Sequence, residues 1–224
     1  MTYQGIVFDF NGTLLWDMDL HELVWHEISQ KYLGRDVTAD EWNHLFVGRT
    51  NAEIWPHLLG HVPDRTESDR LSEEKEAAYR RRLLSLPDRV TLADGAIELF
   101  ELCLAHGIEI AIGTASGPTN VNFYIETFGL HRWFRPERIV YDDGTMPGKP
   151  HHALFATAIE RLGLPSQKCI VVEDGVLGIQ AARAAGAGKV FGIWSNETVR
   201  AKLSTVVLDK LIHTFRDVGL EDFR

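Results

Sequence analysis

Carboxylate side chains follow two apolar runs that are far apart in the sequence. Asp9 comes after the run at residues 6–8, and Glu173 and Asp174 come after the run at residues 170–172. Such runs predict buried strands of an α/β sheet, and parallel strands present their carboxyl ends at one shared edge. Adjacent buried carboxylates repel each other unless a cation lies between them. The pattern indicates a Mg²⁺ site of oxygen ligands, beside which Asp9 is equipped to attack a phosphoryl group.

Two further segments carry groups that bind anions. Thr114 and Ser116 follow the apolar run at residues 108–113, where hydroxyl groups and the N–H groups of the next turn form an anion cradle. Lys149 precedes Pro150 and an apolar helix, and proline in the first helical turn would hold the ammonium group at the helix entrance. A positive charge there suits phosphoryl transfer. Each segment alone is equally typical of an ordinary helix cap or a surface lysine.

These segments resemble, in order and at plausible spacing, the four motifs of the haloacid dehalogenase (HAD) superfamily. Its first motif, Asp-x-Asp-Gly-Thr, is matched by residues 9–13, except that Asn11 replaces the second Asp. The most specific match is to the fourth motif, by Glu-Asp-x-x-x-Gly-x-x-Ala-Ala at residues 173–182. The replaced Asp is the general acid/base of the family's phosphatases and mutases. The resemblance therefore leaves open whether this chain retains turnover.

The resemblance implies a role for each matched residue. Asp9 would attack phosphorus, and Thr114 and Lys149 would hold the phosphoryl oxygens. Four residues would bind the Mg²⁺ cofactor: Asp9, Asn11 through its backbone carbonyl, Glu173 and Asp174.

The segment between the first two motifs has helical periodicity, with capping-box patterns at Thr38 and Thr50. We predict a helical cap domain at residues 17–88, inserted into a catalytic core of residues 1–16 and 89–224. The following elements are expected: helices at 21–32, 38–46, 50–59 and 66–86, then helices that alternate with strands at 108–113, 139–141, 169–172 and 190–193, and finally a short strand at 206–207 with a terminal helix. This alternation indicates an α/β fold with a doubly wound parallel sheet, the Rossmann-like HAD core.

A cap inserted at this position resembles the β-phosphoglucomutase-like and phosphoglycolate-phosphatase-like branch of the superfamily. In that branch a His in His-x-x-x-Trp faces the site, and His21 has this place, although a His at a helix start is as often simply exposed. Arg49 lies in a segment similar to the cap loop that reaches substrate. We therefore expect His21, Arg49 and Ser116 to bind substrate. The mutase pattern has Ser-Arg where this chain has Thr50 and Asn51, which favours a phosphatase.

Composition excludes several other classes of protein. A net charge of −9 and a pI near 5.5 argue against binding to nucleic acid or to an anionic membrane. Cys103 and Cys169 are isolated, so neither a disulfide framework nor a zinc site is indicated. No apolar run approaches the ~18 residues of a membrane span. We expect a cytoplasmic monomer whose partner is a small phosphorylated metabolite.

The preferred interpretation is a Mg²⁺-dependent phosphatase that acts on a sugar phosphate through an aspartyl-phosphate intermediate. One alternative is a phosphate-ester-binding protein with little turnover. Another is a β-phosphoglucomutase-like phosphosugar mutase, which needs proton transfer in both half-reactions and so suffers more from Asn11.

Overall fold

The structure, a computed structural model, describes residues 2–224 and divides the chain into two compact units. One comprises Met1–Trp16 and Thr91–Arg224, and we call it the sheet unit. The other, Asp17–Val90, is the helical unit. The predicted boundary at residue 88 lies within the 3₁₀ turn η2 (Pro87–Arg89), and the structural division follows Val90. Among the described residues, no helix is long and apolar enough to cross a membrane.

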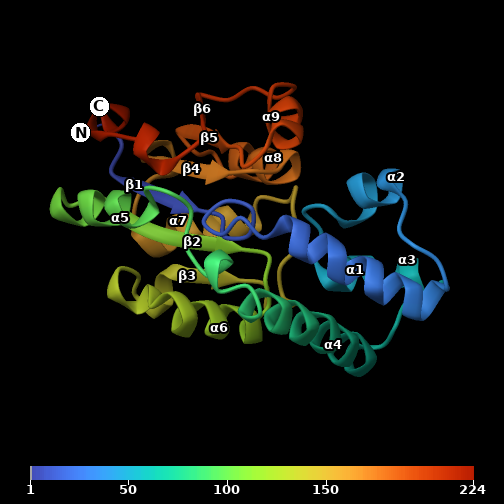
Figure 1. Cartoon of the computed structure of the whole chain (residues 1–224). Coiled ribbons are helices and arrows are strands. Elements are labelled where there is room, and N and C mark those ends of the chain that lie inside the picture. Colours follow the sequence, from blue (N-terminus) through green and yellow to red (C-terminus); the bar gives the residue numbers. More distant parts are fainter. Residues whose placement is uncertain (1) are drawn as a thin grey trace. The chain divides into compact units, whose positions relative to one another are not determined.

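The sheet unit contains a six-stranded parallel sheet in the order β3-β2-β1-β4-β5-β6 (Figure 1). Its strands are β1 (Gly5–Phe8), β2 (Glu109–Thr114), β3 (Ile139–Tyr141), β4 (Cys169–Glu173), β5 (Lys189–Ile193) and β6 (Lys210–Ile212). Gly5 of β1 is paired with Glu109 of β2 on one side and with Cys169 of β4 on the other. The order reverses at β1, which is the signature of a doubly wound sheet. This fold class confirms the prediction from sequence.

Alternate residues of β1 face two different apolar layers. Val7 belongs to a core cluster with Phe155 and Ile179 of the helices that follow β3 and β4. The ring of Phe8 instead packs edge-on against Phe100 at 5.3 Å and Phe215 at 5.7 Å. Burial on both faces explains why the strands read as continuous apolar runs rather than as an alternating pattern.

The helices of the sheet unit are α5 (Ala96–Ala105), α6 (Pro118–Phe128), α7 (Ala153–Leu162), α8 (Val176–Ala184) and α9 (Glu197–Leu203). The expectation that Pro150 lies in the first turn of α7 is wrong. A turn in which His151 N donates to Gly148 O at 3.0 Å comes first, and the helix begins at Ala153.

The end of the chain also differs from the expectation. Val207 is 82% exposed and outside any strand, whereas the last strand is β6. The expected terminal helix is replaced by two 3₁₀ turns, η6 (Phe215–Asp217) and η7 (Leu220–Phe223), with Gly219 between them. An edge strand needs no continuous apolar run, so the polar β6 gave a weaker pattern than Val206 and Val207.

The helical unit is built from α1 (Met18–Leu33), α2 (Ala39–Glu41), the π-helical turn η1 (Trp42–Phe46), α3 (Asn51–Leu59) and α4 (Arg65–Leu84). The predicted capping boxes at Thr38 and Thr50 are present. Its core is aromatic, with Trp25 packed edge-on against Trp55 at 5.1 Å and against Phe46 at 5.4 Å.

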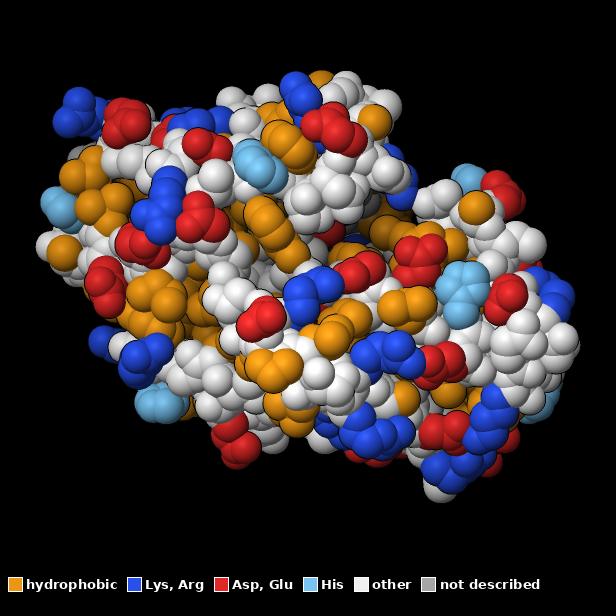
Figure 2. All heavy atoms as spheres, in the orientation of Figure 1, with side chains coloured by type: hydrophobic (Ala, Val, Ile, Leu, Met, Phe, Trp, Pro, Cys, Tyr) orange, Lys and Arg blue, Asp and Glu red, His pale blue; other side chains and the backbone are white. Residues whose placement is uncertain are grey.

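Charged side chains of both signs lie next to one another over the face shown in Figure 2. Ion pairs in the described part of the chain include Arg89 with Asp19 at 2.8 Å and Lys210 with Asp222 at 2.7 Å. On this face, acidic side chains are thus accompanied by basic ones.

Candidate active site

Three carboxylates meet where β1 and β4 end. Phe8 pairs with Val172 in the parallel ladder, and the N–H of Asp9 donates to the carbonyl of Val172 at 3.0 Å. Asp9 therefore lies beside Glu173, the last residue of β4, and Asp174. One ligand oxygen from each of these three side chains lies within 4.8 Å of the others. This is the convergence that the sequence predicts.

Two glycines leave room for these carboxylates. A Cβ atom on Gly178 would lie 1.7 Å from Oε1 of Glu173, and one on Gly12 would lie 2.2 Å from Oδ2 of Asp174. Gly12 also has a φ of +82°, a region that side chains other than glycine rarely adopt. Both glycines are thus required by the positions of the carboxylates.

Lys149 is a buried group of this cluster and not a surface lysine. Its Nζ donates to Oδ1 of Asp9 and to Oε1 of Glu173, each at 2.6 Å, and the residue is 5% exposed. Burial acts to lower the pKa of Lys149, but the carboxylates of Asp9 and Glu173 outweigh it and raise that pKa above its ordinary value. The ammonium group is therefore charged at neutral pH.

A single ammonium group leaves the cluster short of positive charge. Burial, together with the charge of Glu173, raises the pKa of Asp9 from 3.8 to about 7, although Lys149 acts to lower it. Burial and the charges of Glu173 and Asp9 also raise the pKa of Asp174 well above its ordinary value. Asp9 and Asp174, which resist ionisation in this way, form a set of three oxygen ligands with Glu173. Such a set fits a hard divalent cation such as Mg²⁺.

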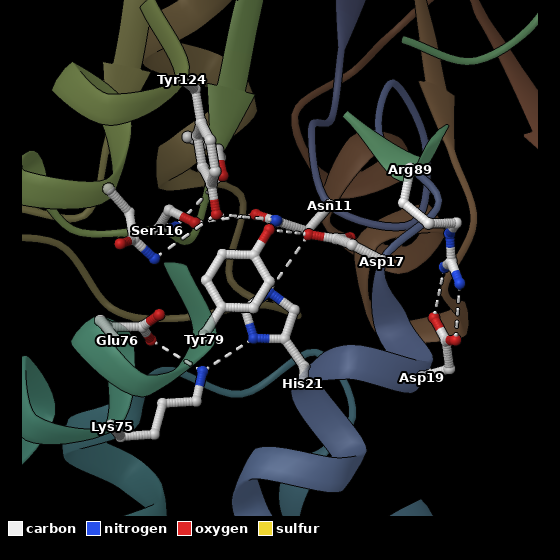
Figure 3. A network of polar contacts seen from close by, with 12 residues as sticks. Asn11, Asp17, Asp19, His21, Lys75, Glu76, Tyr79, Arg89, Ser116 and Tyr124 are labelled. Carbon is white, nitrogen blue, oxygen red and sulfur yellow. Dashed lines mark hydrogen bonds and ion pairs between the residues drawn. The ribbon is translucent and has the colours of Figure 1, made fainter. Parts of the chain in front are cut away.

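Thr114 and Ser116 lie at the end of β2, on the other side of β1. Thr114 is 2% exposed, and its Oγ1 accepts from the N–H of Ser116 at 3.1 Å. The hydroxyl of Ser116 donates to Oδ1 of Asn11 at 2.8 Å, and Nδ2 of Asn11 donates to Oη of Tyr124 at 2.9 Å (Figure 3). The amide of Asn11 is thus held between two hydroxyl groups of the sheet unit.

His21 and Arg49, the other expected substrate-binding residues, belong to the helical unit. Nδ1 of His21 lies 2.8 Å from Nζ of Lys75, which also donates to Glu76 at 2.8 Å (Figure 3). Lys75 is only 2% exposed. Burial acts to raise the pKa of Glu76, but the charges of Lys75 and His21 outweigh it and lower that pKa from 4.5 to about 2. Arg49 is half-buried and lies 3.5 Å from Glu53.

The structure thus brings together, within the sheet unit, the seven expected residues Asp9, Asn11, Thr114, Ser116, Lys149, Glu173 and Asp174. Lys75 and Tyr124 are not among the site residues expected from the sequence. For both residues, the spacing from buried positions of the same helix is a sequence signal that the side chain is buried. Lys75 falls four residues from Leu71 and Tyr79, which are both buried in α4, and Tyr124 falls on the buried face of α6. A polar residue in a buried helical stripe marks a position where a side chain has a specific partner.

The fold and the site define a hydrolase of known class. A family model described as haloacid dehalogenase-like hydrolase matches residues 3–186. The chain belongs to this family, which confirms the resemblance seen in the four motifs.

Individual members of the family are similar to this chain over most of its length. Fructose-1-phosphate phosphatase YqaB of Escherichia coli (strain K12) is 29% identical over 199 residues, which cover 84% of this chain and 95% of that protein. The crystal structure of a HAD hydrolase of family IA, variant 3, from Entamoeba histolytica HM-1:IMSS has a TM-score of 0.87 and 36% identity over 98% of this chain and 97% of that one. β-Phosphoglucomutase from Clostridium difficile has the same fold, with a TM-score of 0.77 at 22% identity over 98% of this chain and 95% of that one.

Proposed function

We propose that this protein is a Mg²⁺-dependent phosphatase that hydrolyses a small phosphorylated sugar through an aspartyl-phosphate intermediate. The observation that carries the proposal is the meeting of three carboxylates, of which those of Asp9 and Glu173 are buried, with the Lys149 ammonium group at the end of β1. The similarity to a fructose-1-phosphate phosphatase supports the choice of substrate class. In this proposal, the sheet unit is the catalytic core and the helical unit is the cap that selects the substrate.

Asp9 is the nucleophile. Its carboxylate extends from the end of a rigid central strand, and contact with Lys149 at 2.6 Å favours the ionised form that attack requires. Lys149 and Thr114 hold the non-bridging phosphoryl oxygens, where charge accumulates during transfer.

Mg²⁺ would be held by Asp9, by the backbone carbonyl of Asn11, by Glu173 and by Asp174. When bound there, it would supply positive charge that offsets the charge of the phosphoryl group. The carbonyl of Asn11 does not depend on the side chain, so the substitution of Asn for Asp is compatible with metal binding. His21 and Arg49 of the helical unit and Ser116 of the sheet unit would bind the substrate.

The test is hydrolysis of a panel of sugar phosphates, including fructose 1-phosphate, in the presence of Mg²⁺ or of EDTA. We expect phosphate release that requires Mg²⁺ and that is lost in Asp9→Asn, which keeps the size of the side chain but removes the nucleophile. A matched control is Asp88→Asn, an exposed carboxylate of η2, which should leave activity unchanged.

Ligand binding without hydrolysis would contradict the proposal. If no ester in the panel is hydrolysed, while calorimetry shows that both Mg²⁺ and inorganic phosphate bind, the protein is a phosphate-ester-binding protein. The neutral amide at Asn11 is the observation that favours this second candidate.

A further inference from the structure

Tyr124 is held beside Asn11 by contacts from three directions. Its ring stacks on Phe10 with centroids 4.3 Å apart and planes 20° from parallel. Its Oη accepts from Nδ2 of Asn11 at 2.9 Å and, more weakly, from Nδ2 of Asn120 at 3.4 Å. Asn120 and Tyr124 are one helical turn apart on the buried face of α6. The position of the phenol is therefore built into the sheet unit.

The side chain of Asn11 cannot donate a proton to an alkoxide, because an amide is not an acid in water. The hydroxyl groups of Ser116 and Tyr124 both contact it (Figure 3). The proton of Ser116 is directed to Oδ1 of Asn11, and an alcohol is a much weaker acid than a phenol. Oη of Tyr124 instead accepts hydrogen bonds from the N–H groups of two amides, so its own proton is directed away from both amides.

We propose that Tyr124 is the proton donor to the leaving oxygen, in the role that a carboxyl group at position 11 would otherwise have. This inference rests on the proposed phosphatase function. Tyr124 is 1% exposed, as the proposed phosphoryl-binding residue Thr114 is 2% exposed. Oη of Tyr124 lies one hydrogen bond from the Asn11 amide, so a leaving oxygen bound at that amide would lie within the range of proton transfer from the phenol. The N–H groups of Asn11 and Asn120 then stabilise the phenolate that remains, because hydrogen bonds to a charged form favour it.

The steps balance over one turnover. In the first, an oxygen of Asp9 bonds to phosphorus, the bond from phosphorus to the ester oxygen breaks, and that oxygen takes the electron pair and the Tyr124 proton. The alcohol leaves. In the second, water bonds to phosphorus and gives a proton to the Tyr124 phenolate, while the bond to Asp9 breaks and its electron pair returns to the carboxylate. Ester and water have become alcohol and phosphate, and both side chains are restored.

The experiment compares two leaving groups in Tyr124→Phe, which removes one oxygen and keeps the ring on Phe10. Fructose 1-phosphate releases an alkoxide that needs a proton, whereas p-nitrophenyl phosphate releases a stable phenolate. We measure kcat/KM, which reports the steps up to departure of the alcohol. We expect it to fall by about 10²-fold or more on the sugar phosphate and by less than about tenfold on the aryl phosphate. Tyr141→Phe, at the end of β3, is the matched control.

A second variant separates loss of a proton donor from disturbed packing. Asn11→Asp restores a carboxyl group, and in the Tyr124→Phe background it should recover most of the lost activity on fructose 1-phosphate. Equal losses on both substrates, no loss, or no recovery in the double variant would each overturn the role of Tyr124, while the phosphatase function would stand. If the parent protein hydrolyses neither ester, the proposed function fails and this inference fails with it.

Discussion

Replacing Lys149 with Met should expose how strongly the carboxylate cluster depends on one ammonium group. Methionine is nearly as long as lysine but carries no charge, so the contacts at 2.6 Å to Asp9 and Glu173 are lost while most of the volume is kept. Removing one partner from a buried ion pair typically costs about 3 to 5 kcal/mol. The pKa of Asp9 rises from 3.8 to about 7 even with Lys149 in place, so ionising that carboxyl group already costs roughly 4 kcal/mol and would cost more without the ammonium group.

The sign of the pH dependence follows from the same shift. A carboxyl group whose pKa is raised in the folded state stabilises the protein most below pH 3.8, and this contribution is lost as the pH rises through about 7. Without Lys149, which acts to lower the pKa of Asp9, the loss should extend to higher pH. We expect Lys149→Met in EDTA to lose about 3 kcal/mol or more of unfolding free energy at pH 8, and less at pH 5.

Urea denaturation with and without Mg²⁺ tests this reasoning. Mg²⁺ at 100 times its dissociation constant would add about 2.7 kcal/mol to the variant's stability. Lys168→Met, which replaces an exposed lysine, is the control. A Lys149→Met protein as stable as the parent at pH 8 in EDTA would show that the carboxylates do not repel one another in the way that the raised pKa values of Asp9 and Asp174 require.

Two further substitutions test parts of the structure separately. Gly178→Ala would place a Cβ 1.7 Å from Oε1 of Glu173, so Mg²⁺ affinity measured by calorimetry should fall at least tenfold, whereas Gly117→Ala, whose Cβ would meet nothing closer than 3.8 Å, should leave it unchanged. Glu76→Gln removes a carboxylate whose pKa is lowered from 4.5 to about 2. This contribution is present above pH 4.5 and is lost as the pH falls through 2, so urea denaturation should show a deficit of up to about 3 kcal/mol at pH 7 that disappears near pH 2. A deficit that is constant with pH would instead indicate a packing defect.

Strand ends were the most predictable part of the fold, for a physical reason. β1 and β4 are covered on both faces, so their sequences are continuous apolar runs, and Asp9 and Glu173 stand out at the points where those runs stop. The pairing of β1 with β4 then follows from the shared edge of a parallel sheet. β6 was not predictable in this way, because an edge strand beginning with Lys210 has no such run.

The partners of buried polar side chains could not be predicted. Lys75 lies in α4, whose many charged residues resemble a solvated helix, and only its spacing from Leu71 and Tyr79 distinguishes it. The contact between Asn11 and Tyr124 joins the turn after β1 to the buried face of α6. This contact depends on how α6 packs against the turn, and the local sequence does not predict that packing.

The central position of β1 has a consequence for synthesis of the chain. This strand precedes the others in the chain, yet Gly5 finds its partners only at Glu109 and Cys169. A growing polypeptide therefore carries residues 6–8 without a strand partner until the whole helical unit and β2 are made, and with only one partner strand until β4 is made. The helical unit is continuous in sequence, so its own contacts are available once Val90 has left the ribosome. The sheet unit cannot close around β1 until β4 is complete, so this apolar strand needs protection from aggregation during synthesis.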